Sequence, residues 1–165
     1  GIETEMSILY KNPAEVGADR IVNSVAAYEK YGGPLIIVDF GTATTFDVVS
    51  QKGEYLGGAI SPGVQLSLEA LFKSAAMLPR VDMAEPEYVI GKSTIESIHS
   101  GTVYGFVGMI DGMVLRIQEE LQQKTQVIGT GGIVDLIASK TKTIDIIDPF
   151  LTLEGLRIIH RRNQG

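Results

Sequence analysis

Apolar runs broken by glycine-rich turns divide the middle of the chain into short strands. The pattern predicts strands over roughly 35–40, 44–50 and 54–60. A short Gly-Thr-Ala turn separates the first two, which predicts an antiparallel hairpin. A second turn at 51–53 leads into the third strand. We therefore expect a three-stranded antiparallel meander.

Helical patterns lie on both sides of this meander. Asn12 and Pro13 are a typical N-cap and first helical residue, and an amphipathic run follows them until the Gly-Gly-Pro at 32–34. A second helix is expected to open at Pro62-Gly63 and continue to about residue 72. A third pattern covers 93 to about 122 and predicts helix in two pieces.

The last third of the chain alternates between strand and helix. Strands are predicted at 126–129 and 144–147, with a helix between them and a final helix from 153 to about 161. The full order is helix, three antiparallel strands, helices, then strand-helix-strand-helix, which is typical of an α/β protein with a mixed sheet. A ribonuclease-H-like half-domain has this arrangement, and other folds share the same order.

Composition narrows the class of protein. The 165 residues suffice for one domain, and 44% hydrophobic with 21% charged residues indicates a globular chain. A net charge of −6 argues against a general nucleic-acid or membrane-surface binder. The absence of cysteine excludes disulfides, thiol catalysis and cysteine-ligated zinc. Residues 101–115, interrupted by Asp111, are too short to span a bilayer, so we expect a cytoplasmic protein.

The segment DFGTATT begins with a carboxylate at the end of an apolar strand. A buried charge is costly unless it is paired or bound to a cation, so Asp39 favours a cation site. Gly41 and the threonines at 42, 44 and 45 supply N–H and hydroxyl groups that could hold phosphate oxygens. An equally supported alternative is a hairpin whose Asp and Thr side chains cap their own turn.

Three other segments carry weaker signals. In GADR, residues 17–20, Asp19 could act as a base and Arg20 could hold an anion, although helix-dipole compensation with a solvated arginine is the simpler alternative. GGAISPG at 57–63 predicts close backbone approach to a ligand or strand, or else a bulge and a helix cap. TGG at 130–132 follows a strand, where doubly wound proteins often bind nucleotides, but a tight turn also fits.

The ordered set of motifs is more specific than any one of them. NPAEVGADR, DFGTATTFDVV, GGAISPG, GTVYGF and GTGG together resemble the type III pantothenate kinase family, within the superfamily of acetate and sugar kinases, heat-shock ATPases and actin. The resemblance runs from about Ile8 to the end of the chain. It implies ATP-dependent phosphorylation of pantothenate to 4'-phosphopantothenate, the first step of coenzyme A biosynthesis.

The resemblance also implies roles for individual residues. Asp19 matches the proton acceptor that activates the pantothenate hydroxyl. The residues matching substrate contacts are Tyr10, Gly17, Ala18, Arg20 and Thr94.

The cofactors follow from the same resemblance. Asp39 matches a ligand of a monovalent cation, potassium or ammonium, which would explain a carboxylate at the end of a buried strand. Thr42 matches an ATP contact, and Gly131 and Gly132 lie where the family has its nucleotide-binding turn. Mg²⁺ is expected with ATP.

One departure from the family is large. Its members begin with a first ribonuclease-H-like domain whose DxGNT motif binds phosphate and Mg²⁺, and DxGNT is absent from this sequence. We therefore expect residues 1–165 to be the C-terminal ribonuclease-H-like domain of a two-domain kinase, inactive by itself.

The expected partner is a second copy of the chain, since the family forms homodimers. Glycines at 101, 105, 108 and 112 share one helix face, which is a candidate dimer contact or, equally, a packing face inside the subunit. The alternative function is a non-catalytic relative acting as a transcriptional accessory or binding protein, and a kinase for a sugar or carboxylate is a third. The presence of Asp19, Arg20, Asp39 and Thr42 argues against the non-catalytic alternative.

Overall fold

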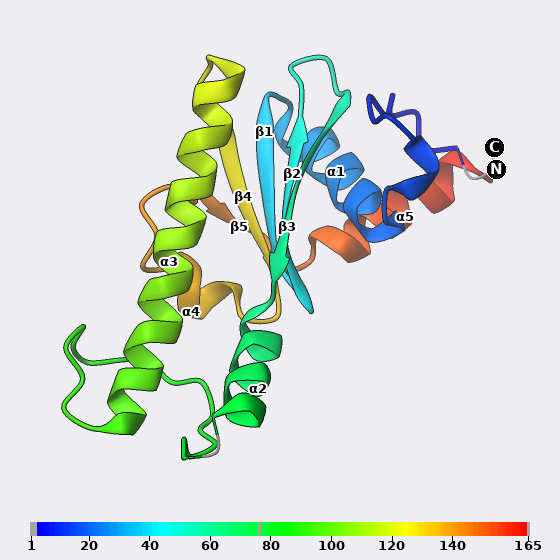
Figure 1. The fold of residues 1–165 in the computed structure, drawn as a ribbon. Coiled ribbons are helices and arrows are strands. Elements are labelled where there is room, and N and C mark those ends of the chain that lie inside the picture. Colours follow the sequence, from blue (N-terminus) through cyan, green and yellow to red (C-terminus); the bar gives the residue numbers. More distant parts are fainter. Residues whose placement is uncertain (1–2, 76, 165) are drawn as a thin grey trace.

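A five-stranded mixed sheet forms the centre of the protein, in a computed structural model that describes residues 3–75 and 77–164 (Figure 1). The strand order is β3-β2-β1-β4-β5. The β1–β2 and β2–β3 pairs are antiparallel, whereas β1–β4 and β4–β5 are parallel. The strands are β1 Leu35–Phe40, β2 Ala43–Val49, β3 Tyr55–Pro62, β4 Gln126–Gly131 and β5 Ile146–Ile147. This confirms the predicted meander and the ribonuclease-H-like fold class.

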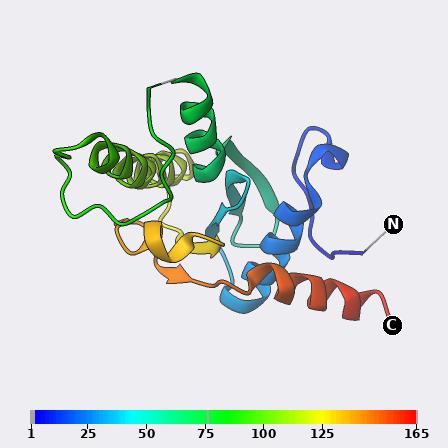
Figure 2. The ribbon, with the colours of Figure 1, turned by 90° about the horizontal axis from the view of Figure 1, so that it is seen from below.

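Helices cover both faces of the sheet. The helices α1 and α5 lie on one side, α3 and α4 on the other, and α2 continues below the end of β3 (Figures 1 and 2). Their bounds are α1 Ala18–Tyr31, α2 Val64–Ser74, α3 Thr94–Leu121, α4 Val134–Ala138 and α5 Leu151–Arg162.

The first helix begins later than the sequence pattern predicted. Asn12 caps only a short 3₁₀ helix, η1 (Pro13–Glu15), by accepting the Ala14 N–H at 3.3 Å. Val16 is extended, with ψ of 121°, so the chain leaves the helical conformation before α1 starts at Ala18. The prediction that Asn12 is an N-cap is therefore confirmed, but the residue caps the 3₁₀ helix and not α1.

The third helix is continuous, so the prediction of two pieces was wrong. It has 28 residues and begins with Ser93, whose hydroxyl accepts the Glu96 N–H at 3.2 Å. The Glu96 carboxylate in return accepts the Lys92 N–H at 2.6 Å, which resembles a capping box. No proline interrupts the helix, and buried Val103, Ile110 and Val114 fasten one side of it to the core.

Alternation along β1 separates two apolar layers. Leu35 and Ile37 belong to the layer beneath α1 and α5, while Ile36 and Val38 belong to the layer beneath α3 and α4. Because side chains alternate with period two, Asp39 shares the α1 side with Leu35 and Ile37. The long apolar run of β1 is thus explained by burial on both faces.

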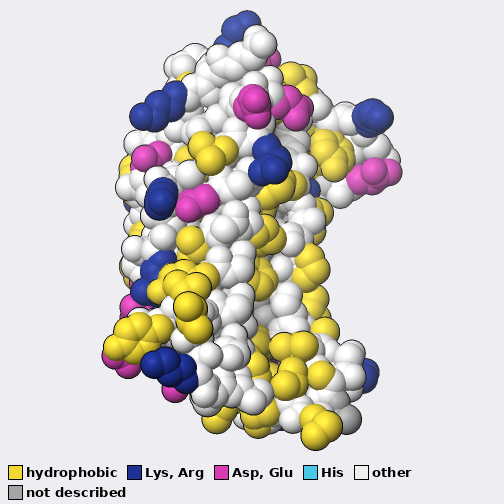
Figure 3. All heavy atoms as spheres, turned by 60° about the vertical axis from the view of Figure 1, so that its left-hand side comes forward, with side chains coloured by type: hydrophobic (Ala, Val, Ile, Leu, Met, Phe, Trp, Pro, Cys, Tyr) yellow, Lys and Arg dark blue, Asp and Glu magenta, His cyan; other side chains and the backbone are white. Residues whose placement is uncertain are grey.

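The glycine face of α3 is open. A Cβ built on Gly101, Gly105 or Gly108 would have no atom within 4 Å among the described residues, so the expectation that this face packs inside the subunit is contradicted. Figure 3 brings forward the left-hand side of Figure 1 and shows apolar side chains beside a strip of uncharged surface. Across the described residues, we find no helix with the length and apolar character that a membrane crossing requires.

Candidate functional site

The first turn of α1 lies against the carboxyl end of β1. Asp19 is exposed in that turn, and one helical turn later the Asn23 amide donates a hydrogen bond to Asp39 Oδ2 at 2.8 Å. The buried Asn23 is itself oriented, because Thr152 of α5 donates to its carbonyl oxygen at 2.7 Å. Two acidic residues that the sequence placed in separate motifs therefore share one side of the sheet.

Arg20 points into the protein rather than into water. Its Nε donates to Asp47 Oδ1 at 2.6 Å, and its guanidinium lies 5.8 Å from the centre of the Tyr55 ring. Tyr55 and Thr45 also donate to Asp47, at 2.8 and 3.2 Å. The alternative of a solvated arginine is therefore wrong.

Sequence reasoning missed Asp47 and Tyr55. Asp47 is completely buried, and this burial raises the pKa of its carboxyl, while Arg20, Tyr55 and Thr45 oppose the rise. The available signal was a carboxylate that alternation places on the inner face of an apolar strand.

Tyr10 joins the same group from the N-terminal segment. Backbone hydrogen bonds of 2.8 Å tie Ser7 and Leu9 to Tyr55 at the start of β3. The Tyr10 and Tyr55 ring centroids are 6.4 Å apart, and a Cβ on Gly57 would lie 3.5 Å from the Tyr10 ring. The predicted substrate contacts from Tyr10 to Arg20 are therefore neighbours in space.

Asp39 also meets the glycine turn after β4. A Cβ on Gly131 would come within 2.8 Å of Asp39 Oδ1 and 2.7 Å of the Phe40 backbone, and φ is +105°. Only glycine fits this approach without strain. Thr42 is exposed in the neighbouring β1–β2 turn, and Gly132 has open space around it. The DFGT and TGG segments thus lie side by side at the carboxyl ends of β1 and β4.

The threonines of DFGTATT do not act together. Thr44 is fully buried on the opposite, α3-facing side of the sheet, where its hydroxyl has no hydrogen-bond partner among the described residues. Thr45 is engaged with Asp47. Of the three, only Thr42 is free to face a ligand at this edge, and the Asp39 side chain bonds to Asn23 rather than capping its own turn.

The electrostatics at Asp39 suit a cation. Burial raises the pKa of its carboxyl, and the like charge of Asp19 adds to the rise, while Asn23 lowers it. Among the described residues, no lysine or arginine forms an ion pair with Asp39. A single unpaired carboxylate can be neutralised by a monovalent cation. The described residues hold no cluster of three or more His, Asp or Glu suited to a metal ion, so a dedicated protein site for Mg²⁺ is not found there.

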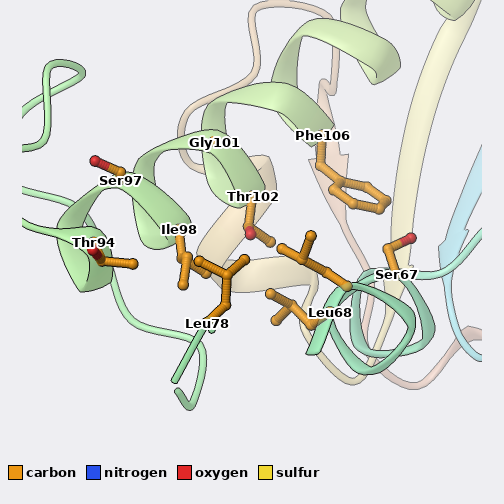
Figure 4. Close-up of a pocket in the computed structure, with 10 residues that line it drawn as sticks. Ser67, Leu68, Leu78, Thr94, Ser97, Ile98, Gly101, Thr102 and Phe106 are labelled. Atoms are coloured by element: carbon orange, nitrogen blue, oxygen red, sulfur yellow. The ribbon is translucent and has the colours of Figure 1, made fainter. Parts of the chain in front are cut away.

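Thr94 is the one predicted contact that stands apart. It begins α3 on the other side of the sheet and borders a cavity of about 540 Å³ between α2 and α3 (Figure 4). None of Tyr10, Asp19, Arg20 or Asp39 lines that cavity, which is bounded by Ser67, Leu68, Leu71, Leu78, Thr94, Ser97, Ile98, Gly101, Thr102 and Phe106. Within one chain, the structure does not bring Thr94 to the other candidates.

Fold and site together define a class. A sheet of this order, with an acidic strand end and glycine turns at the carboxyl edge of its parallel pair, has the ribonuclease-H-like fold. A solved structure from Campylobacter jejuni, described as a proposed Baf family transcriptional activator, has this fold. It superposes with a TM-score of 0.66 over 96% of this chain and 69% of its own, at 23% identity.

The family is defined by sequence. The family described as type III pantothenate kinase matches residues 1–116. Type III pantothenate kinases from Myxococcus xanthus and Moorella thermoacetica are 58% and 55% identical, over 100% and 99% of this chain. The chain therefore belongs to the type III pantothenate kinase family. It spans 64% of the length of each of these two relatives.

Proposed function

We propose that the intact protein transfers the terminal phosphoryl group of ATP to pantothenate, giving 4'-phosphopantothenate in the first step of coenzyme A biosynthesis. Family membership supports the substrates. The observation that carries the proposal is Asp19 itself, which is exposed in the first turn of α1, next to Arg20, and near enough to Asp39 for its charge to raise the pKa of that carboxyl.

The residues divide into two sets of roles. Asp19 accepts the proton of the pantothenate hydroxyl, because a hydroxyl is a weak nucleophile without a base. Tyr10, Gly17, Ala18 and Arg20 orient the substrate for in-line attack.

ATP binds at the carboxyl ends of β1 and β4, where the DFGT and TGG segments lie. Thr42, Gly131 and Gly132 face the ATP phosphates, and Asp39 holds potassium or ammonium. When bound, that cation and the Mg²⁺ carried by ATP neutralise phosphate charge. The Asp39 carboxylate fits this role because no basic side chain among the described residues pairs with it.

We also propose that residues 1–165 form the C-terminal of two ribonuclease-H-like domains in a cytoplasmic enzyme. The relatives are longer than this chain, and the DxGNT motif that the family resemblance implies for a first domain is absent from this sequence. The other domain would supply the second wall of the ATP cleft.

A homodimer is proposed through the open glycine face of α3. The support is that Gly101, Gly105 and Gly108 meet nothing within 4 Å among the described residues. Gly105→Leu should yield a monomer in light-scattering measurements, whereas the control Arg157→Leu on α5 should not. A dimer retained by Gly105→Leu would contradict the proposal.

The test of function is a phosphorylation assay on the intact protein. Asp19→Asn should lower kcat on the order of 100- to 10,000-fold, the usual contribution of a general base. Asp135→Asn, an exposed carboxylate at the start of α4, changes the charge equally and should leave kcat unchanged. Full activity of Asp19→Asn, or equal turnover of sugars or acetate, would overturn the proposal.

A further inference from the structure

The guanidinium of Arg20 is enclosed on several sides. Nε donates to Asp47, Nη2 donates to the Phe46 carbonyl oxygen at 3.5 Å, and the Tyr55 ring lies beneath the group. Further along β3, a Cβ on Gly58 would be only 3.0 Å from Nη2, so a larger residue there would crowd the guanidinium. The side chain of Arg20 keeps 10% of its surface accessible.

The Asp47 carboxylate interacts only with side chains around Arg20 among the described residues. Among residues 3–75 and 77–164, the hydrogen bonds to its carboxylate come from Arg20, Tyr55 and Thr45, which together reach both oxygens. Arginine stays protonated in proteins, and a bond to a carboxylate both fixes its plane and compensates its charge. A buried ion pair contributes little net stability compared with apolar side chains, so its presence calls for another explanation.

We propose that Asp47 is a positioning residue for phosphoryl transfer. It locks the guanidinium of Arg20 in one orientation, with Tyr55 and Thr45 holding Asp47 in turn. The N–H groups of Arg20 that remain free then point at the substrate as preorganised donors. This inference rests on the proposed function, because it assigns Arg20 to pantothenate binding.

The geometry explains why positioning is needed. A free arginine loses considerable rotamer freedom when it binds a ligand, and this loss weakens binding. Asp47 and the Tyr55 ring remove that freedom before the substrate arrives. The expected signature is therefore a change in pantothenate binding with little change in ATP binding.

The experiment is a double-mutant cycle on the intact protein. Asp47→Asn should raise the KM for pantothenate at least tenfold and leave the KM for ATP within twofold. In an Arg20→Gln background the same Asp47 substitution should change the pantothenate KM less than twofold, because its target is gone.

Two controls separate positioning from folding. Asp148→Asn removes another buried carboxylate, paired with Lys30 far from this group, and should lower stability without changing the pantothenate KM. Tyr55→Phe keeps the ring but removes one bond to Asp47, and should raise the pantothenate KM two- to fivefold. It decides the question if Asp47→Asn does not fold.

Each contrary result has its own meaning. A folded Asp47→Asn or Tyr55→Phe variant with wild-type pantothenate KM overturns the inference, as do effects of Asp47 and Arg20 that multiply in the cycle. In both cases the proposed function stands. A wild-type protein without pantothenate-dependent turnover overturns the proposed function and this inference with it.

Discussion

Replacing Asp39 by asparagine should stabilise the protein while destroying its activity. Asn23 is the one neutral donor to this partly buried carboxylate among the described residues, and the nearby charge of Asp19 has the same sign. Asparagine keeps the shape and the bond from Asn23 but removes the charge. We expect the free energy of unfolding to rise by about 1 kcal/mol, typical of a single stabilising substitution.

The gain should depend on pH in a defined direction. The pKa of Asp39 is raised, mainly by burial, above the usual 3.8, so the folded state holds the proton more tightly than the unfolded state. The wild-type protein therefore loses stability as pH rises from 3.8 through the folded-state pKa. The advantage of Asp39→Asn should be complete at neutral pH and shrink as pH falls towards 4.

Thermal unfolding in potassium-free and potassium-containing buffers of equal ionic strength measures both the gain in stability and its dependence on the cation. About 1 kcal/mol corresponds to a melting temperature higher by about 2–4 °C for a chain of this size. Potassium should stabilise the wild type and not the variant. The charge-matched control Asp135→Asn, exposed in the first turn of α4, should not stabilise. A loss of stability in Asp39→Asn, or a potassium effect that survives it, would refute the reasoning.

Three further substitutions test the interactions that stabilise the fold, one beside the site and two away from it. Gly58→Ala places a Cβ 1.7 Å from the Phe46 carbonyl oxygen, so the pairing of β2 with β3 must shift. Circular dichroism should therefore show a melting temperature lowered by several degrees. An unchanged melting temperature would contradict this prediction. Ser93→Ala removes the N-cap of α3 and should cost about 1 kcal/mol in denaturant unfolding. Asp148→Asn should cost about 2 kcal/mol at neutral pH. Burial alone would raise the pKa of Asp148, but hydrogen bonds from Lys30 and Tyr31 lower it below 3.8. The stability lost in Asp148→Asn should therefore disappear only as pH falls through that lowered pKa.

The strands and the fold class were predictable because their signals are local. Apolar runs and glycine turns located β1, β2 and β3, and the TGG turn marked the end of β4. The order of these elements fitted a ribonuclease-H-like half-domain, but it also fitted other α/β folds.

The contacts of the site were not predictable from local pattern. The Arg20–Asp47 pair joins residues 27 positions apart and depends on how α1 crosses the face of β2, which no periodicity encodes. The start of α1 was misplaced because Asn12 and Pro13 cap a separate 3₁₀ turn. The roles of Asp19, Asp39 and Thr42 came from resemblance to a family, and the structure adds which of these residues are neighbours.

The most direct test is to incubate the intact protein with ATP and pantothenate and to look for 4'-phosphopantothenate by mass spectrometry. The intact mass of the same preparation should be measured alongside, with and without potassium at constant ionic strength. The account predicts potassium-dependent product from a protein as long as the relatives from Myxococcus xanthus and Moorella thermoacetica. A protein of that length that forms no product under either condition would contradict it.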